Sequence, residues 1–283
     1  MRTISRIALN SFRESVRDKV LYNLVAFAVL LIGVSLLIGQ LTAGQEVKII
    51  KDLGLASVSI FGTFIAVFIG IGLVSKEVER RSIYGLIAKP LSRTQLVLGK
   101  YAGLAFTLAV NVGVMTLAIY LVLAWWHSQT PENVRAAWAA PALDPALLTA
   151  IGLIYLELLV VVAIAIVFST YSSAILSAAF TLGLVVAGHF SQDLRNFDQV
   201  VDSPAAQALA RGLYYVLPNL SFFDVKARVA HGEAVAWGEV GLAAAYAAVY
   251  ISSLLTLAVW IFSRRDFKWA WRWSRRGRPR PCS

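Results

Sequence analysis

The sequence predicts an all-α integral membrane protein. Of its 283 residues, 58% are hydrophobic and only 15% are charged, and the mean hydropathy is +0.70. A soluble domain carries roughly a quarter charged residues, so this chain could not cover itself with a wettable surface. Its apolar windows are nearly continuous and lack the alternation of a barrel strand. This pattern favours helices, which satisfy their own backbone hydrogen bonds in lipid.

Six windows have the length of a transmembrane helix, about 17–25 residues. We expect one transmembrane domain over 1–283, with spans near 20–39, 55–74, 101–124, 145–168, 174–190 and 240–262. The first window is longer than a secretory signal core, and no convincing small-residue cleavage site follows it, so we interpret it as a retained span. The domain divides into 1–19 (interfacial helix), 20–74 (spans one and two), 75–98 (coupling segment), 99–190 (spans three to five), 191–239 (external segment), 240–262 (span six) and 263–283 (basic tail).

The distribution of Lys and Arg predicts the orientation of these spans. If the N-terminus is cytoplasmic, the inside segments hold 19 of the 26 basic residues and only five acidic ones. The outside segments then hold seven basic and ten acidic residues. This arrangement follows the positive-inside rule. We therefore predict six spans with both the N- and the C-terminus in the cytoplasm.

The first 19 residues predict an amphipathic helix. An apolar residue recurs every four positions and four arginines share another face: Ile4, Ala8, Phe12 and Val16, against Arg2, Arg6, Arg13 and Arg17. Such a helix is suited to lie along the cytoplasmic membrane surface. Two interpretations stay open, namely a lipid anchor alone or a helix that also contacts a cytoplasmic partner.

The external segment and the tail both predict contact with the membrane edge. Residues 191–239 contain a helix start at Ser203-Pro204 and a break at Pro218, which favours a cap in the outer interface over a substrate gate. The tail at 263–283 interleaves tryptophans with basic residues. Because it directly follows a span on the positive side, we attribute this pattern to membrane lipids rather than to nucleic acid.

Pairs of small residues four positions apart predict close helix packing within the membrane. Three such pairs occur: Gly99 with Gly103, Gly183 with Ala187, and Ala243 with Ala247.

The sequence offers no catalytic or cofactor motif. It has no phosphate-binding loop, its only cysteine is Cys282, and the three histidines (His127, His189 and His231) are widely separated. We therefore expect no catalytic residue, no metal site and no cofactor bound by this chain.

Glu157 is a charged residue inside one of the predicted spans. A carboxylate inside a membrane helix is costly and marks a functional site by default. The surrounding stretch YLELLVVVAIAI offers it no basic partner. We consider a role in the transport path or in the contact between two copies, with a solvated position near the outer edge as the alternative.

The segment between spans two and three is charged, yet it is patterned like a helix. Its acidic and basic residues come first, an apolar stripe follows, and a proline ends it: Glu77, Glu79, Arg80 and Arg81, then Ile83, Tyr84, Leu86 and Ile87, then Pro90. We expect this helix to begin at Ser75 and a new helix to begin at Ser92. A short helix with one apolar stripe suits docking into a groove of another protein.

This segment, read as KEVERRSIYGLIAKPLSR and LVLGK, resembles the corresponding part of the ABC-2 class of ATP-binding-cassette permeases. The resemblance implies a bacterial cytoplasmic (inner) membrane, a separate cytoplasmic ATPase that holds ATP and Mg, and two permease copies with two ATPase subunits. It implies that these residues couple the permease to the ATPase: Glu77, Glu79, Arg80, Arg81, Ile83, Tyr84, Leu86, Ile87, Pro90 and Arg93.

Within that class, three stretches are similar to the sequences of permeases of multicopper-enzyme maturation, including the nitrous-oxide reductase maturation system. These stretches are KEVE, IYGLIAKPLSR and YYVLPNLSFFD. This similarity implies export, periplasmic enzyme maturation or envelope assembly. Two other functions stay open. One is a stand-alone secondary transporter or channel, and the other is an ATPase-linked membrane scaffold that moves no cargo.

Overall fold

The structure, a computed structural model, describes residues 2–41, 44–79, 92–135, 138, 141–191, 207, 212 and 217–264. For Arg2, Thr3, residues 73–79, Arg93 and Arg264 it describes the backbone only. Within these ranges the fold is all-helical, without a strand. The elements are α1 (Arg2–Val16), α2 (Lys19–Gln40), α3 (Glu46–Glu79), α5 (Arg93–Gln129), α6 (Glu132–Arg135), α7 (Ala146–Tyr171), α8 (Ala174–His189), η2 (Leu220–Phe223), α11 (Lys226–Ala230) and α12 (Trp237–Arg264).

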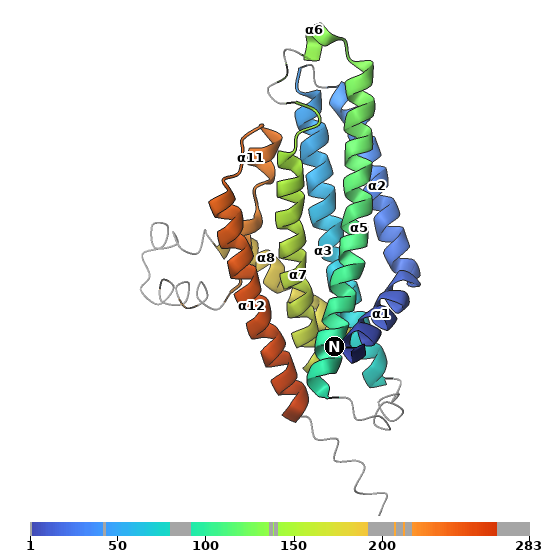
Figure 1. The fold of residues 1–283 in the computed structure, drawn as a ribbon, viewed down its shortest axis with the longest axis vertical. Helices are drawn as coiled ribbons and strands as arrows, with labels where there is room; N and C mark the ends of the chain where they lie inside the picture. The colour runs from blue at the N-terminus through green and yellow to red at the C-terminus, as the bar shows by residue number, and fades with distance from the viewer. Residues whose placement is uncertain are drawn as a thin grey trace, which may run out of the picture.

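The long helices form an elongated bundle with two distinct ends (Figure 1). We call the lower end in that view the α1 end, because α1 lies there beside the last turns of α3 and the first turns of α5. The upper end, which carries α6, is the α6 end. The helices α2, α3, α5, α7, α8 and α12 alternate in direction along the chain, so that α7 and α12, with the short α8 between them, run the same way.

Five helices are long and apolar enough to cross a membrane: α2, α3, α5, α7 and α12. They correspond to five of the six predicted windows. The remaining window, 174–190, is α8, which has only 16 residues. At a rise of 1.5 Å per residue it is about 24 Å long, less than the roughly 30 Å of a hydrocarbon core. The protein is therefore a multi-pass membrane protein in which α8 is the shortest apolar helix of the described bundle.

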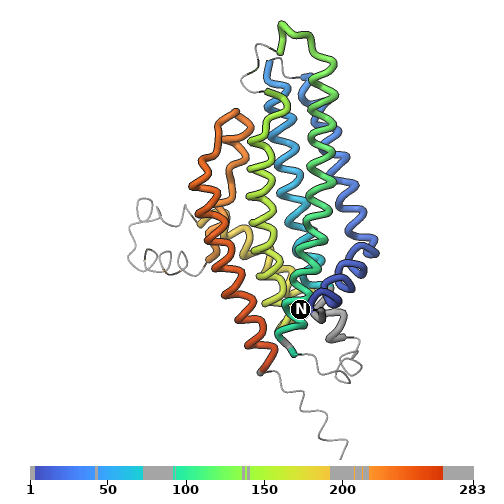
Figure 2. Tube along the Cα trace, viewed as in Figure 1, coloured from blue at the N-terminus to red at the C-terminus, as the bar shows by residue number. Residues whose placement is uncertain are grey.

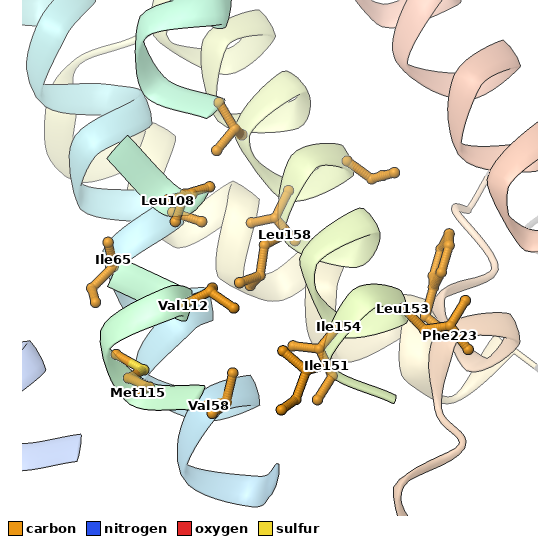
Figure 3. Packing of buried hydrophobic residues seen from close by; sticks show 14 of the residues in the cluster. Val58, Ile65, Leu108, Val112, Met115, Ile151, Leu153, Ile154, Leu158 and Phe223 are labelled. Carbon is orange, nitrogen blue, oxygen red and sulfur yellow. The ribbon is translucent and has the colours of Figure 1, made fainter. Parts of the chain in front are cut away.

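Helix α7 lies at the centre of the bundle. It packs against α3, α5, α8 and α12, and most of its side chains are buried. Its sequence is apolar all round, which suits a helix that contacts protein on every side. Figure 3 shows the inner part of this core, where side chains of α3, α5 and α7 meet: Val58 and Ile65, Leu108, Val112 and Met115, and Ile151, Ile154 and Leu158.

Two glycines of α3 set its distance from α7. A Cβ atom at Gly62 would lie 2.6 Å from Cδ1 of Leu158, and one at Gly70 would lie 2.7 Å from Cβ of Ala165. Small residues allow membrane helices to approach this closely. The contact between α3 and α7 therefore depends on Gly70, and near Gly62 on the position of the Leu158 side chain.

The three predicted small-residue pairs have different outcomes. Ala243 and Ala247 of α12 are buried in the core, as expected of a packing face. By contrast, Gly183 has no atom within 4 Å of its would-be Cβ, so this glycine packs against nothing within the described chain. The pair in α5 contacts α1, as described below.

Candidate functional site

The predicted coupling segment is bracketed by the two longest helices of the structure. Helix α3 has 34 residues and α5 has 37. They are therefore about 51 and 55 Å long, well beyond the roughly 30 Å needed to cross the hydrocarbon core. Residues 80–91 connect them at the α1 end and lie outside the described part of the chain.

Most predicted coupling residues fall within this gap. Arg80, Arg81, Ile83, Tyr84, Leu86, Ile87 and Pro90 lie outside the described residues. Glu77 and Glu79 belong to the last turn of α3, and Arg93 is the first residue of α5, with only the backbone described for all three. Their role in coupling therefore stays a prediction.

The predicted helix start at Ser75 is wrong. The backbone of α3 continues without a break from Glu46 to Glu79. The stretch from 73 to 79 contains neither glycine nor proline, and its lysine and glutamates are good helix formers, so nothing in the sequence ends the span there. The acidic residues thus continue a long helix instead of opening a short one.

The predicted helix start at Ser92 is confirmed. Ser92 has an extended backbone, and its Oγ accepts a hydrogen bond from the backbone N–H of Gln95 at 3.2 Å. This is the geometry of an N-cap. The cap lies directly after residues 80–91, and α5 therefore begins at Arg93.

Helix α1 packs against the first turns of α5 through the Gly99 and Gly103 pair. A Cβ atom at Gly99 would lie 2.8 Å from Cβ of Ile7, and one at Gly103 would lie 2.5 Å from the carbonyl oxygen of Ala8. Figure 2 shows α1 resting against the lower part of α5. The glycine pair therefore seats an N-terminal helix against a span, whereas we expected it to join two spans.

The two faces of α1 have different surroundings. Its apolar stripe turns toward α5, where Phe12 and Phe106 have ring centroids 4.7 Å apart. Arg6, Arg13 and Arg17 are exposed. The stripe that was expected to rest on the membrane surface thus packs, at least in part, against protein. Helix α1 is therefore packed directly on the first turns of α5.

Glu157 lies in the middle of α7 and is only 1% exposed. Its Oε1 lies 3.3 Å from Nε2 of His189, the last residue of α8. The solvated alternative for Glu157 is thereby excluded for this structure. A role in the transport path or between two copies stays a prediction.

Sequence reasoning missed His189 as the partner of Glu157, because the two residues are 32 positions apart and His189 was placed at an outer membrane end. The short length of the fifth apolar window, 174–190, was the available signal. A helix of 16 residues that starts beside the end of α7 reaches only about halfway back along it. Its last residue must then lie at the depth of Glu157.

A second polar group lies beside this pair. Nζ of Lys226 in α11 donates to Oγ of Ser59 in α3 at 3.2 Å and lies 3.6 Å from Oδ1 of Asp224. Nearby, Ser191 donates to Oδ1 of Asn219 at 2.9 Å. These contacts tie the end of α8 and the start of η2 to the same region of the bundle.

The α6 end holds a buried ion pair that the sequence did not reveal. Lys51 is fully buried, and its Nζ donates to the carbonyl oxygen of Pro141 at 2.9 Å and lies 3.5 Å from Oδ2 of Asp144. The other carboxylate oxygen of Asp144 accepts from the backbone N–H of Ala146 at 2.9 Å, at the start of α7. We expected residue 51 in an outside loop, but α3 already begins at Glu46, so the helix carries this lysine into the core.

Among the described residues, no group of three His, Cys, Asp or Glu side chains could hold a metal ion.

Comparison with known proteins bears on the whole chain. The sequence model of the family described as ABC-2 family transporter protein matches residues 5–267, from α1 through α12. A comparison with curated proteins found no match. The family's members are membrane components of ATP-binding-cassette transporters and act in transport, not as catalysts themselves. The chain belongs to the ABC-2 family of transporter permeases.

Proposed function

We propose that this chain is the permease subunit of a transporter driven by a separate cytoplasmic ATPase, with two permease copies and two ATPase subunits. ATP and Mg would bind to the ATPase alone. The family match supports the transporter class, and the chain's own sequence lacks a phosphate-binding loop. A separate ATPase would supply the ATP-driven motion.

The observation that carries this proposal is the arrangement around the coupling segment. Two long continuous helices, α3 and α5, lead directly from this segment into the core, where both contact α7. Because a helix transmits displacement along its axis, a push on residues 77–90 would reach the centre of the bundle. Helix α1 would follow, since Gly103 holds it against α5.

In the proposed cycle, ATP closes the ATPase dimer, which moves the coupling segment as a lever. The apolar residues Ile83, Tyr84, Leu86 and Ile87 fill a groove of the ATPase, and the charged residues around them orient the contact. The motion opens a path between two permease copies. The balance of basic residues supports placement in a bacterial inner membrane with both termini in the cytoplasm.

For the cargo, we propose export, periplasmic enzyme maturation or envelope assembly, by likeness to permeases of multicopper-enzyme and nitrous-oxide reductase maturation. The stretch YYVLPNLSFFD supports this likeness. Two residues in the second half of this stretch, Leu220 and Phe223 of η2, are buried in the core of the bundle.

The test is co-purification from the native host in mild detergent, using a tagged chain. The wild-type chain should bring an ATPase in near-equal amount. Replacing Ile83 and Leu86 by Asp should abolish this association. The matched control replaces Leu41 and Leu143, two exposed leucines at the α6 end, by Asp, and this variant should retain the ATPase.

Two outcomes would contradict the proposal. One is a stable wild-type chain that brings no ATPase. The other is equal loss of the ATPase in both double variants, because the effect would then come from the added charge and not from its position.

A further inference from the structure

Glu157 and His189 meet at mid-depth of the bundle. Glu157 lies 11 residues after the start of α7 and 14 before its end, about 17 and 21 Å along the helix. Neither of its carboxylate oxygens has a well-aligned hydrogen-bond donor, and the nearest described positive partner is the imidazole, at 3.3 Å. An ionised carboxylate left alone in such a place would be very costly. The pair must therefore be considered as one unit.

The number of protons in this unit follows from its hydrogen bonds. Nδ1 of His189 lies 3.0 Å from the carbonyl oxygen of Val185, which can only accept, so Nδ1 carries a hydrogen. Nε2 then either carries a proton beside a carboxylate or accepts one from a protonated carboxyl group. In both cases the pair holds one proton besides the one on Nδ1, and it is neutral overall. Removal of that proton would leave a buried negative charge facing a nitrogen lone pair.

The surrounding charges are few. His189 is the only titratable residue of α8, and Lys226 of α11, already engaged with Ser59 and Asp224, is the nearest cation on a neighbouring element. From α5 and α7, the phenols of Tyr101 and Tyr155 both donate to backbone carbonyl oxygens, those of Leu159 and Ala105. On α12, the hydroxyl oxygen of Tyr246 accepts a hydrogen bond from the backbone N–H of Asn219 at 2.8 Å.

The end of α8 is also tightly packed. A Cβ atom at Gly188 would lie 2.7 Å from the carbonyl oxygen of Pro218. The hydroxyl of Ser191 is bonded to Asn219. The residues just before and just after the stretch from 192 to 216 therefore meet beside His189. A displacement of His189 would therefore also displace Ser191 and Pro218.

We propose that Glu157 and His189 form a proton-binding site inside the membrane, and that its proton holds the end of α8 against α7. With the proton in place, the pair is neutral and closed. When the proton leaves, the uncompensated carboxylate draws water, and the last turn of α8 separates from α7. This inference concerns the permease alone and does not depend on the proposed ATPase partner.

The experiment measures amide hydrogen exchange at Val185–His189 in the full chain, purified in lipid nanodiscs, from about pH 5 to 10. Glu157→Gln is measured at each pH beside the wild type, so that the intrinsic pH dependence of exchange cancels. The Gln amide can still donate to Nε2 but has no proton to release. We expect the ratio of wild-type to variant exchange to be flat at low pH and to rise about tenfold per pH unit once the pair releases its proton.

The matched control is Tyr155→Phe, which removes a hydrogen bond of α7 two residues away without removing a proton site of the pair. It should keep the wild-type pH profile. The swapped variant, Glu157→His with His189→Glu, should restore the pH dependence that Glu157→Gln has lost. If Glu157→Gln does not fold, Glu157→Met, which also has no proton to release, serves as the reference in the same measurement.

The proposal is overturned if the ratio stays constant across the pH range, because the pair then binds no proton that α8 depends on. It is also overturned if Tyr155→Phe loses the pH dependence, since the effect would then come from general loosening of α7.

Discussion

Gly103 of α5 lies so close to α1 that a Cβ atom there would come within 2.5 Å of the carbonyl oxygen of Ala8. A carbonyl group in a helix cannot move without moving the helix. One missing methyl group therefore determines where the N-terminal helix can sit, and it does so about three turns from the start of α5. The N-terminal helix and the coupling segment are in this way attached to the same few turns.

We predict that Gly103→Leu displaces α1 without unfolding the spans. Overpacking at a close contact costs about 1–3 kcal/mol. Amide exchange across residues 4–12 should therefore rise strongly, while α7 stays protected. The matched control is Gly113→Leu on the same helix, where no atom lies within 4 Å of the added Cβ. Equal exchange of α1 in both variants would contradict the seating of α1 by Gly103.

Three glycines of α3 can be compared with one another, because an added Cβ atom would meet different surroundings at each. At Gly62 the added Cβ would meet the far end of a leucine side chain, which can rotate away, whereas at Gly70 it would meet the Cβ of Ala165, which cannot. At Gly72 nothing lies within 4 Å. Alanine in a helix also gains about 1 kcal/mol over glycine.

We therefore predict that Gly72→Ala stabilises, Gly62→Ala is close to neutral, and Gly70→Ala destabilises by about 1–3 kcal/mol despite the gain in helix propensity. The free energy of unfolding, measured by denaturant titration in detergent micelles, checks this order. A Gly70→Ala variant as stable as Gly72→Ala would show that α3 and α7 are not in close contact there.

The buried ion pair of Lys51 and Asp144 predicts an asymmetric response. Asp144→Asn keeps an acceptor for the Ala146 N–H but leaves a fully buried ammonium group without an anion. Breaking such a pair costs about 3–5 kcal/mol. Lys51→Met should cost less, because the carboxylate it leaves behind is 12% exposed and still accepts from Ala146.

Unfolding of both single variants and of the double variant forms a complete mutant cycle. The double variant, Lys51→Met with Asp144→Asn, should recover most of the stability that Asp144→Asn loses. Additive losses would mean that the two residues do not interact.

Continuous apolar windows predicted where the long helices lie, because in lipid a helix is the simplest way to satisfy the backbone. The start of α5 was also predictable, since serine at an N-cap acts through a local hydrogen bond. The sequence did not predict that α3 continues past Ser75 to Glu79, because the edge of a membrane gives no signal that stops a helix. For the same reason Lys51 was placed in a loop, although it lies in the second turn of α3.

The partners of buried charged groups could not be predicted either. Glu157 and His189 are distant in sequence, and their contact depends on the length and direction of α8. The glycine pair in α5 was correctly interpreted as a packing site, but the sequence did not identify α1 as its partner. Small residues indicate a close approach without saying which helix approaches. The predicted ATPase-coupling role of residues 77–93 rests on their apolar stripe and on the resemblance.

The start of α5 also predicts a local effect next to the coupling segment. Ser92→Ala removes the acceptor for the Gln95 N–H and should destabilise the first turn by about 1 kcal/mol. Amide exchange at Gln95 should then increase about fivefold, while α5 beyond Gly103 is unchanged. In an intact transporter this fraying would soften the connection between residues 77–90 and the span, so transport per ATP hydrolysed should fall as well.

Ser173 is the matched control for this prediction. It occupies the N-cap position of α8 with a similar extended backbone, but its side chain makes no capping hydrogen bond. Ser173→Ala should therefore leave exchange at the start of α8 unchanged. If the two substitutions raise exchange equally, loss of the hydroxyl itself and not of the cap is responsible. If neither does, the start of α5 is held by the packing of α1 on Gly99 and Gly103 instead, which the Gly103→Leu variant would then reveal.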